Sequence, residues 1–460
     1  MARAGKRATR LRLRMIALVF IAVVGVALVI LRVVAQRPDM RTIEVGPHPV
    51  ALSIDPDNGR AYVASTGNDS VSVLDIKTAM LIRVVRVGPG PQRVLVVGRN
   101  RRAFVINYGR GVGSVSVLDA MSGRLLRTTP VGGSATNAVT DIQTGRIFVA
   151  TTSGPELAGR VVILDARDGR ELGTVPVGND PIAMAISERA GRVFVVNTGS
   201  GTVSMLDARS GTTIRTVGIG WLSGGIVVDE RVQHAFIVAR SDNAVAVLDA
   251  YNGRLLHKTR VGHDPGAIVL DKQDGHAFIT NMGDGSTSVL DTASGRLVGT
   301  LRVGQDISMM FIAARGHRLL IGDKVTGAIH AFDARTLTPL YTSNLGSVPF
   351  AGVADDLRGL AIVTALGGMN HGKLPTGQGM VAVIDAMSGN VLQRLGTGST
   401  PYFVGVDERV GRAFVVDGSE IHENNTWAWV PQAVRGALSL PSSTRLVSSA
   451  RVIILDDEHI

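Results

Sequence analysis

The hydrophobic and polar positions of this chain follow a pattern that recurs about every 42 residues. Each unit begins with V-G-x-x-P and a short apolar run. It continues with segments like G-R-A-Y-V and S-V-S-V-L-D and ends in a polar or basic run. Alternating apolar and polar residues between glycine-rich turns predict four strands per unit. In the fourth unit the predicted strands are 182–186, 192–197, 202–207 and 213–217.

Three positions of the unit recur in register. One large apolar residue, usually aromatic, lies in the second strand and is expected to pack between neighbouring sheets, as at Phe194. The position two residues before it is basic in eight units, as at Arg192, His234 and His276, and is expected on a solvated hairpin edge. An acid ends the third strand, often with glycine four residues later, which predicts a turn. This aspartate occurs nine times: Asp75, Asp119, Asp165, Asp207, Asp249, Asp291, Asp333, Asp385 and Asp456.

Four antiparallel strands in about 42 residues is the size of one β-propeller blade. The sequence therefore predicts an all-β propeller of four-stranded antiparallel blades, built from nine repeat units. Residues 42–45 resemble a fourth strand with no first three before it, and only four residues follow Asp456. We expect this N-terminal strand to complete the last blade and close the ring. Since propellers usually have about four to eight blades, eight blades remain an alternative to nine.

Two segments carry a resemblance to a known family. V-V-N-T-G at 195–199 and I-T-N-M-G at 279–283 each lie between V-G-x-D-P and a strand that ends in L-D. With these residues the chain resembles the YVTN-type β-propeller repeat over residues 42–460. The likeness weakens in units seven to nine, where Asp323, Ala365 or Asp417 replaces the asparagine. The resemblance implies an exported bacterial or archaeal propeller, and it implies architecture and location more than an activity.

The first forty residues have a different composition. Residues 1–14 form a basic tail with six cations, and residues 15–35 are apolar apart from Arg32. That length suffices to cross a bilayer, and the positive-inside rule places the tail in the cytoplasm. We therefore expect a transmembrane signal-anchor at 15–35 and an extracytoplasmic propeller domain at 36–460, in the periplasm or at the cell surface. The alternative is a protein secreted after cleavage near Ala35.

Charge and cysteine content narrow the function classes. The net charge is +10, but residues 1–41 hold nine cations and one acid, so residues 42–460 carry only +2. Nucleic acid is therefore an improbable partner, because phosphate binding needs clustered cations. The chain has no cysteine, which excludes disulfides, thiolate metal sites and covalent haem attachment. We expect no cofactor and a monomeric body.

The loops before the first strand and between the second and third strands of each unit share one face of a propeller. They vary from unit to unit, as binding loops do on a rigid scaffold. We call this side the variable-loop face. Two insertions lie in it, at about 367–379 and 418–450. Its candidate binding residues are His48, Asp180, Trp221, His263, Asp264, Asp306, His371, Lys373, His422, Glu423, Trp427 and Trp429. A metal site at His371, His422 and Glu423 would require convergence that spacing does not show, so no metal site is predicted.

These observations favour a binding or interaction scaffold that uses the variable-loop face for an unidentified protein or small molecule. The alternative is a propeller enzyme, either a lactonase-like hydrolase or a relative of quinone or haem oxidoreductases. Its catalytic residues are unknown, because no acid–base constellation stands out. A second alternative is binding of single-stranded DNA or another polyanion.

Overall fold

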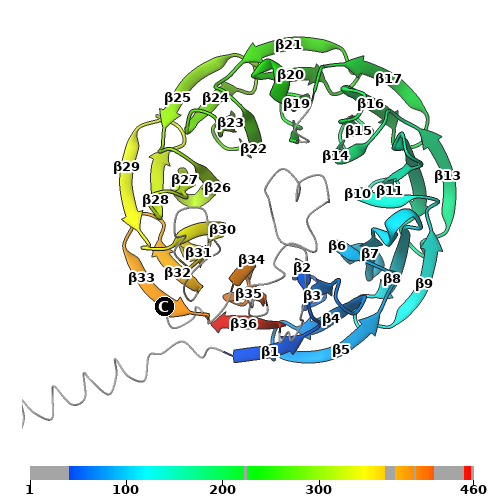
Figure 1. Ribbon diagram of the computed structural model, residues 1–460, viewed down its shortest axis with the longest axis horizontal. Helices are drawn as coiled ribbons and strands as arrows, with labels where there is room; N and C mark the ends of the chain where they lie inside the picture. The colour runs from blue at the N-terminus through cyan, green and yellow to red at the C-terminus, as the bar shows by residue number, and fades with distance from the viewer. Residues whose placement is uncertain (1–40, 222–224, 368–378, 398–399, 419–449, 457–460) are drawn as a thin grey trace, which may run out of the picture.

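The computed structural model describes residues 41–221, 225–367, 379–397, 400–418 and 450–456. Within these ranges the chain forms 36 strands in nine four-stranded antiparallel sheets. The sheets follow one another around a closed ring, each with its first strand towards the axis (Figure 1). The predicted propeller is confirmed, with nine blades rather than eight.

Each blade contributes four successive strands, from the axis outwards. Blades 1 to 3 contain β2 (Pro49–Asp55), β3 (Arg60–Ser65), β4 (Ser70–Asp75), β5 (Met80–Arg86), β6 (Pro91–Val97), β7 (Arg102–Asn107), β8 (Ser114–Asp119), β9 (Leu125–Pro130), β10 (Ser134–Asp141), β11 (Arg146–Ser153), β12 (Ala158–Asp165) and β13 (Glu171–Pro176). Blades 4 to 6 contain β14 (Pro181–Ser187), β15 (Arg192–Asn197), β16 (Thr202–Asp207), β17 (Thr213–Gly218), β18 (Ile226–Asp229), β19 (His234–Ala239), β20 (Ala244–Asp249), β21 (Leu255–Arg260), β22 (Pro265–Asp271), β23 (His276–Asn281), β24 (Ser286–Asp291) and β25 (Leu297–Arg302). Blades 7 to 9 contain β26 (Ile307–Ala313), β27 (Arg318–Asp323), β28 (Ala328–Asp333), β29 (Pro339–Asn344), β30 (Val348–Asp355), β31 (Leu360–Leu366), β32 (Met380–Asp385), β33 (Val391–Gly396), β34 (Thr400–Asp407), β35 (Arg412–Gly418), β36 (Ala450–Asp456) and, from the other end of the chain, β1 (Arg41–Val45).

In the part of the chain that the structure describes, four single-turn 3₁₀ helices lie between strands: η1 (Gly98–Asn100), η2 (Gly109–Gly111), η3 (Arg240–Asp242) and η4 (Ala314–Gly316). The strand bounds of the fourth blade agree with the sequence prediction to within one residue at each end. The period-two pattern and the turn glycines were therefore enough to locate the strands.

The N-terminal strand closes the ring, as predicted. β1 pairs antiparallel with β36, with Ile43 opposite Val452, and completes the ninth blade as its outermost strand. The side chains of Ile43 and Val45 pack against the cluster that joins blades 9 and 1. Without β1, the edge of β36 would lack its ladder partner.

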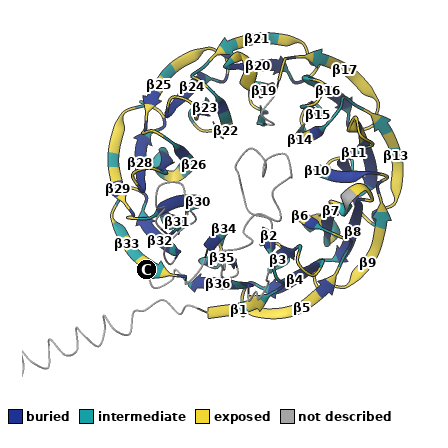
Figure 2. Ribbon diagram, viewed as in Figure 1, coloured by how far each residue is buried: buried dark blue, intermediate teal, exposed yellow. Residues whose placement is uncertain are grey.

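The hydrophobic core is divided into nine clusters, and each cluster lies between two neighbouring blades. The recurring aromatic residue of one blade packs on the next blade: Phe194 of blade 4, for example, packs with Ala235 and Ile237 of blade 5. These aromatic side chains are fully buried. Figure 2 shows the buried second and third strands inside an exposed rim of fourth strands. Because each cluster needs two blades, the ring is held together by its junctions.

The recurring basic residue does not lie on a solvated hairpin edge, and that prediction is wrong. Arg192 stands opposite Asp207 across the β15–β16 ladder, and its Nη1 lies 2.7 Å from the carboxylate. Its Nε donates to the carbonyl of Tyr251 in the next blade at 3.0 Å. His234 and His276 use Nδ1 for the same contact, with the carbonyls of Thr292 and Ala334. In blades 1 to 6 and in blade 9 the basic residue therefore bonds to a main-chain carbonyl of the next blade around the ring, a role we call the blade staple.

Within the described residues no helix is long and apolar enough to cross a membrane. The predicted anchor at 15–35 lies outside these residues. So do almost all residues of the two insertions, including His371, Lys373, His422, Glu423, Trp427 and Trp429. The predictions made for them stay predictions.

Candidate functional site

The loop that precedes the first strand is fixed by backbone contacts in several blades. His48, Asp180 and Asp264 stand just before the strand proline and have φ angles of 51°, 52° and 55°. Their carbonyls accept hydrogen bonds from Thr66, Thr198 and Met282 of the loop between strands two and three, at 2.9–3.0 Å. His, Asp and Asn are enriched in this left-handed conformation. The residue type at this position is thus partly explained by the backbone.

Two of the six described candidate residues, Asp180 and His48, have side-chain contacts within their own blade. The Asp180 carboxylate accepts a hydrogen bond from the Thr198 hydroxyl of its own blade at 2.6 Å. The His48 ring packs against Gly67, where a Cβ atom would lie 2.8 Å from its Cδ2. Both residues fix the geometry of their own loops, and neither forms a hydrogen bond or ion pair with another described candidate.

Three candidates gather around one turn in blade 5. We call residues 240–243 the Arg240 turn; it joins β19 to β20 and contains η3. The Ser241 amide donates to the Trp221 carbonyl at 3.4 Å, and the Asp264 amide donates to the Asn243 side chain at 2.9 Å. Trp221 precedes β18 of blade 5, whereas His263 and Asp264 precede β22 of blade 6. The Arg240 turn therefore joins the loops of two blades.

Two ion pairs connect the Arg240 turn to the loop before β22 and to strand β21. The Arg240 guanidinium binds the Asp264 carboxylate with two nitrogens, one of them at 2.8 Å. This hydrogen bond raises the pKa of Arg240 and lowers the pKa of Asp264. Lys258 forms an ion pair with Asp242 and also donates to the Ile219 carbonyl at 2.8 Å. The Lys258 hydrogen bond is the main cause of the lowered pKa of Asp242. Arg240, Asp242 and Asp264 are therefore charged near neutral pH.

The rim of the cluster is open to solvent. The Trp221 side chain is 75% exposed, and His263 is also exposed. The His263 amide donates to the Asp284 carboxylate at 2.9 Å, so its imidazole is not needed for this contact. Burial by itself raises the pKa of Asp284, but the hydrogen bonds from Ser286 and His263 outweigh it and the net pKa is lowered. An exposed indole and imidazole thus border a set of fixed charges.

Asp306 lies apart from this cluster. Its carboxylate pairs with Lys324 of its own blade at 3.2 Å, and its carbonyl accepts the Lys324 amide at 2.8 Å. The structure therefore brings Trp221, His263 and Asp264 together, and keeps His48, Asp180 and Asp306 in separate loops.

Sequence reasoning missed Arg240 and Lys258, although one signal was present. The turns that occupy the place of 240–243 in blades 1, 4 and 6 begin with Thr66, Thr198 and Met282, whereas blade 5 has an arginine there. In the loop before the first strand, blade 5 has Ser223 where blade 4 has Pro181. The sequence of blade 5 thus departs from the repeat at both loops of the variable-loop face.

The cluster combines ion-paired side chains with an exposed aromatic side chain. No group of three or more His, Asp or Glu side chains in the described part of the chain could hold a metal ion. Two surface depressions of about 470 Å³ lie elsewhere, one at 67–70 with Val84 and Arg86, and one between blades 3 and 4. Mixed fixed charges beside an exposed tryptophan match the composition of protein interfaces, in which Trp and Arg are enriched.

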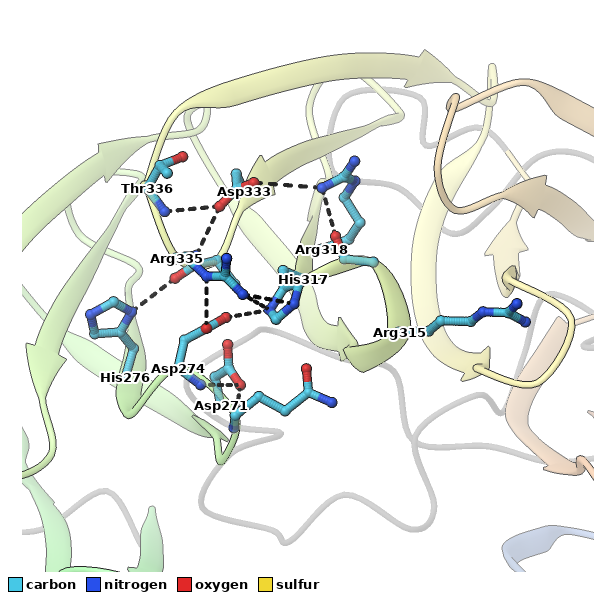
Figure 3. A network of polar contacts seen from close by, with 12 residues as sticks. Asp271, Asp274, His276, Arg315, His317, Arg318, Asp333, Arg335 and Thr336 are labelled. Atoms are coloured by element: carbon cyan, nitrogen blue, oxygen red, sulfur yellow. Dashed lines mark hydrogen bonds and ion pairs between the residues drawn. The ribbon is translucent and has the colours of Figure 1, made fainter.

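A second polar network lies on the opposite face, between blades 6 and 7 (Figure 3). Asp274 of the β22–β23 turn accepts hydrogen bonds from His317 Nδ1 at 2.6 Å and from Arg335 Nε at 3.1 Å. Only 9% of the Asp274 side chain is exposed. Burial raises its pKa, but the two hydrogen bonds outweigh burial and the net pKa lies below the ordinary value. Both side-chain contacts of Asp274 join blade 6 to blade 7, so we interpret them as a further link between blades.

Comparison with known proteins supports the architecture. Residues 55–216 match the profile of a family described as outer membrane protein assembly factor BamB. No curated protein sequence matches the chain. Among solved structures, dihydro-heme d1 dehydrogenase NirN in complex with DHE is similar, with a TM-score of 0.57 and 16% identity over 78% of each chain.

Two other solved structures show the same likeness. BamB from Moraxella catarrhalis has a TM-score of 0.51 and 16% identity over 80% of this chain and 95% of its own. Sqt1 from Saccharomyces cerevisiae has a TM-score of 0.51 and 11% identity over 74% of this chain and 95% of its own. At these identities the likeness concerns the fold alone. The chain is therefore a β-propeller repeat protein that resembles the BamB type over its first blades.

Proposed function

We propose that this protein is a membrane-tethered, extracytoplasmic scaffold that binds a protein partner on its variable-loop face, at the Arg240 turn. The observation that carries the proposal is the convergence of Trp221, His263 and Asp264, from two blades, on one turn with fixed charges. The tether is the apolar segment at 15–35, and the location follows from the basic tail before it.

The openness of the cluster favours a macromolecular partner over a small ligand. Small-molecule sites are concave and bury most of the ligand. Neither of the two depressions noted above is lined by residues of the Arg240 turn or by Trp221. An exposed tryptophan next to arginine is instead a common anchor at protein interfaces.

We also propose that the repeats are of the YVTN type. The burial of the asparagines on which this resemblance rests supports the proposal. Asn197 and Asn281 are fully buried, and each amide donates to two hydroxyls of the neighbouring strand, for example to Ser204 at 3.0 Å. These asparagines therefore serve the scaffold, and the function is sought in the loops that depart from the repeat.

Lysine-directed crosslinking with mass spectrometry tests the proposal on the full chain in its native membranes. Lys258 and Lys324 lie in or beside loops of the variable-loop face, whereas Lys77 and Lys272 lie in exposed turns of the opposite face. We expect crosslinks to one defined protein from Lys258 that are lost when Trp221 and Arg240 are replaced by alanine. Equal crosslinking from Lys77 and Lys272, or no change in the double variant, would contradict the proposed site.

A further inference from the structure

The charge of the body is unevenly distributed between its surfaces. Residues 41–460 carry a net charge of only +3, yet the nine outermost strands of the blades hold nine cations and two carboxylates, a net charge of +7. The cations are Arg41, Arg83, Arg86, Arg127, Arg215, Lys258, Arg260, Arg302 and Arg394, and the acids are Glu44 and Glu171. The rest of the body is therefore acidic on balance, and the positive charge is concentrated on the outer wall.

The outer wall is also apolar at one recurring position. The residue seven places after the recurring aspartate is aliphatic in all eight blades that have a complete repeat on this strand: Ile82, Leu126, Leu172, Ile214, Leu256, Val298, Leu340 and Leu392. Seven of the eight are 39–51% exposed, with Leu256 less so. Scattered exposed aliphatic residues need no explanation, but a ring of them in register on a basic wall is a candidate interaction surface.

Blade 1 differs from all other blades in this surface. Six of the seven residues of β5 are exposed, and four of these are large and apolar: Met80 at 63%, Leu81 at 40%, Ile82 at 39% and Val84 at 48%. In every other blade the outermost strand exposes at most two such residues among those described. Arg83 and Arg86 lie between and beside them, and neither forms a salt bridge with a described residue.

The neighbouring strands extend the same chemistry. β9 of blade 2 exposes Leu125 and Leu126 by 42% and 48% and carries Arg127. β1 lies on the other side, and Arg41 donates to the Thr78 carbonyl of blade 1 at 3.3 Å. These three outer strands stand side by side on the rim (Figure 1). We call the surface of β1, β5 and β9 the basic wall.

We propose that the basic wall rests on an anionic lipid surface. Aliphatic side chains interleaved with arginines are the composition of surfaces that bind anionic membranes, where each cation near the surface is attracted by the lipid charge. β1, which is part of the basic wall, also follows residues 1–40 directly in the sequence. If residues 15–35 span the bilayer, residues 36–40 give β1 a reach of at most about 18 Å from it. This inference rests on the tether in the proposed function and would orient the ring edge-on to the bilayer.

The absence of cysteine makes the test simple, because one introduced cysteine gives one label. Ile82→Cys places an environment-sensitive fluorophore in the basic wall. Leu340→Cys is the matched control: it occupies the same repeat position, is 41% exposed, and lies on β29, a strand without charged residues. The full chain is reconstituted in vesicles of phosphatidylcholine alone or mixed with phosphatidylglycerol, with and without a quencher-bearing lipid.

We expect lipid quenching and a blue-shifted emission at position 82 in vesicles with phosphatidylglycerol, and neither at position 340. Replacing Arg83 and Arg86 by glutamine in the Ile82→Cys background should lower the equilibrium constant for contact of the wall with the lipid by about fivefold for each charge removed. High salt should weaken the signal, since exposed charges are screened. Urea unfolding of each variant checks that the ring remains folded.

Three results would overturn the proposal. Position 82 could remain in water in all vesicles, or positions 82 and 340 could respond equally. A blue shift in detergent without lipid that grows with protein concentration would instead show a second copy of the chain on the wall. None of these outcomes affects the crosslinks expected from Lys258, so failure of the basic wall and failure of the Arg240 turn are distinguishable.

Discussion

At the scale of single residues, an arginine and an aspartate that recur in sequence hold neighbouring blades together. The blade staple places the guanidinium against the third-strand aspartate of its own blade and against a carbonyl of the next, as in Arg60 with Asp75 and Met121. The Asp75 carboxylate also accepts the Thr78 amide of the following turn at 2.7 Å. The sequence repeat identified both positions. It did not predict the hydrogen bond from the arginine to the next blade, because a repeat shows which residues recur within a blade but not which residues of the neighbouring blade they contact.

The staple predicts a stability cost that a surface ion pair does not have. Replacing Arg192 by methionine leaves the Asp207 carboxylate and the Tyr251 carbonyl without their partner, in a site where Arg192 is 23% exposed. We expect a loss of about 1–3 kcal/mol in the free energy of unfolding, measured by urea denaturation. The matched control is Arg170→Met, whose side chain is 69% exposed and should cost less than about 0.5 kcal/mol. Equal costs would contradict the staple.

The lowered pKa of Asp274 predicts a pH dependence with a defined sign. A carboxyl that is more acidic in the folded than in the unfolded state stabilises the fold above its ordinary pKa of 3.8 and loses this effect as pH falls through the folded value. The difference in unfolding free energy between wild type and Asp274→Asn should therefore be largest above about pH 5 and shrink in more acidic buffers.

The control for this measurement is Asp57→Asn, since the Asp57 side chain is 74% exposed. This substitution should change the free energy of unfolding much less than Asp274→Asn does, because the exposed ion pair of Asp57 with Arg409 contributes little. A difference between wild type and Asp274→Asn that stays constant across the acidic range would show that His317 and Arg335 do not stabilise the ionised carboxylate.

At the scale of elements, closure depends on one strand from the far end of the chain. β1 supplies five residues to the ladder with β36 and apolar side chains to the junction of blades 9 and 1. The sequence predicted this pairing, because residues 42–45 resemble the fourth strand of a blade and the last repeat unit is the one that lacks a fourth strand. Blade 5 was not predicted to be special, since its sequence matches the repeat well in the strands and departs from it only in the loops.

Removing β1 should weaken the ring more than removing the residues before it. A chain that starts at residue 47 lacks β1, whereas one that starts at residue 40 retains it. We expect the shorter chain to unfold at a lower urea concentration and to aggregate through the exposed edge of β36. Light scattering and denaturation of the two chains measure this. Similar midpoints would mean that the ladder with β1 contributes little to closure.

At the scale of the whole molecule, the described part of the variable-loop face brings three candidate residues together in one sector, at blades 5 and 6. The sequence predicted the nine units, the closure and the face on which the variable loops lie. It directed attention to the insertions at about 367–379 and 418–450, whereas the described cluster with cross-blade charges lies at blades 5 and 6. Arg240 and Lys258 could not be assigned from sequence, because their roles depend on which loops of adjacent blades touch. We propose that a protein partner binds only at the Arg240 turn, at blades 5 and 6.

The most direct measurement is a scan with a photo-crosslinking residue at five of the six described candidate positions, His48, Asp180, Trp221, His263 and Asp306, in the full chain in its own membrane. These positions sample loops around the variable-loop face. Binding at the Arg240 turn predicts that adducts with one partner concentrate at 221 and 263 and are at background at 48 and 180. A flat profile, or a maximum at 48 or 180, would contradict it.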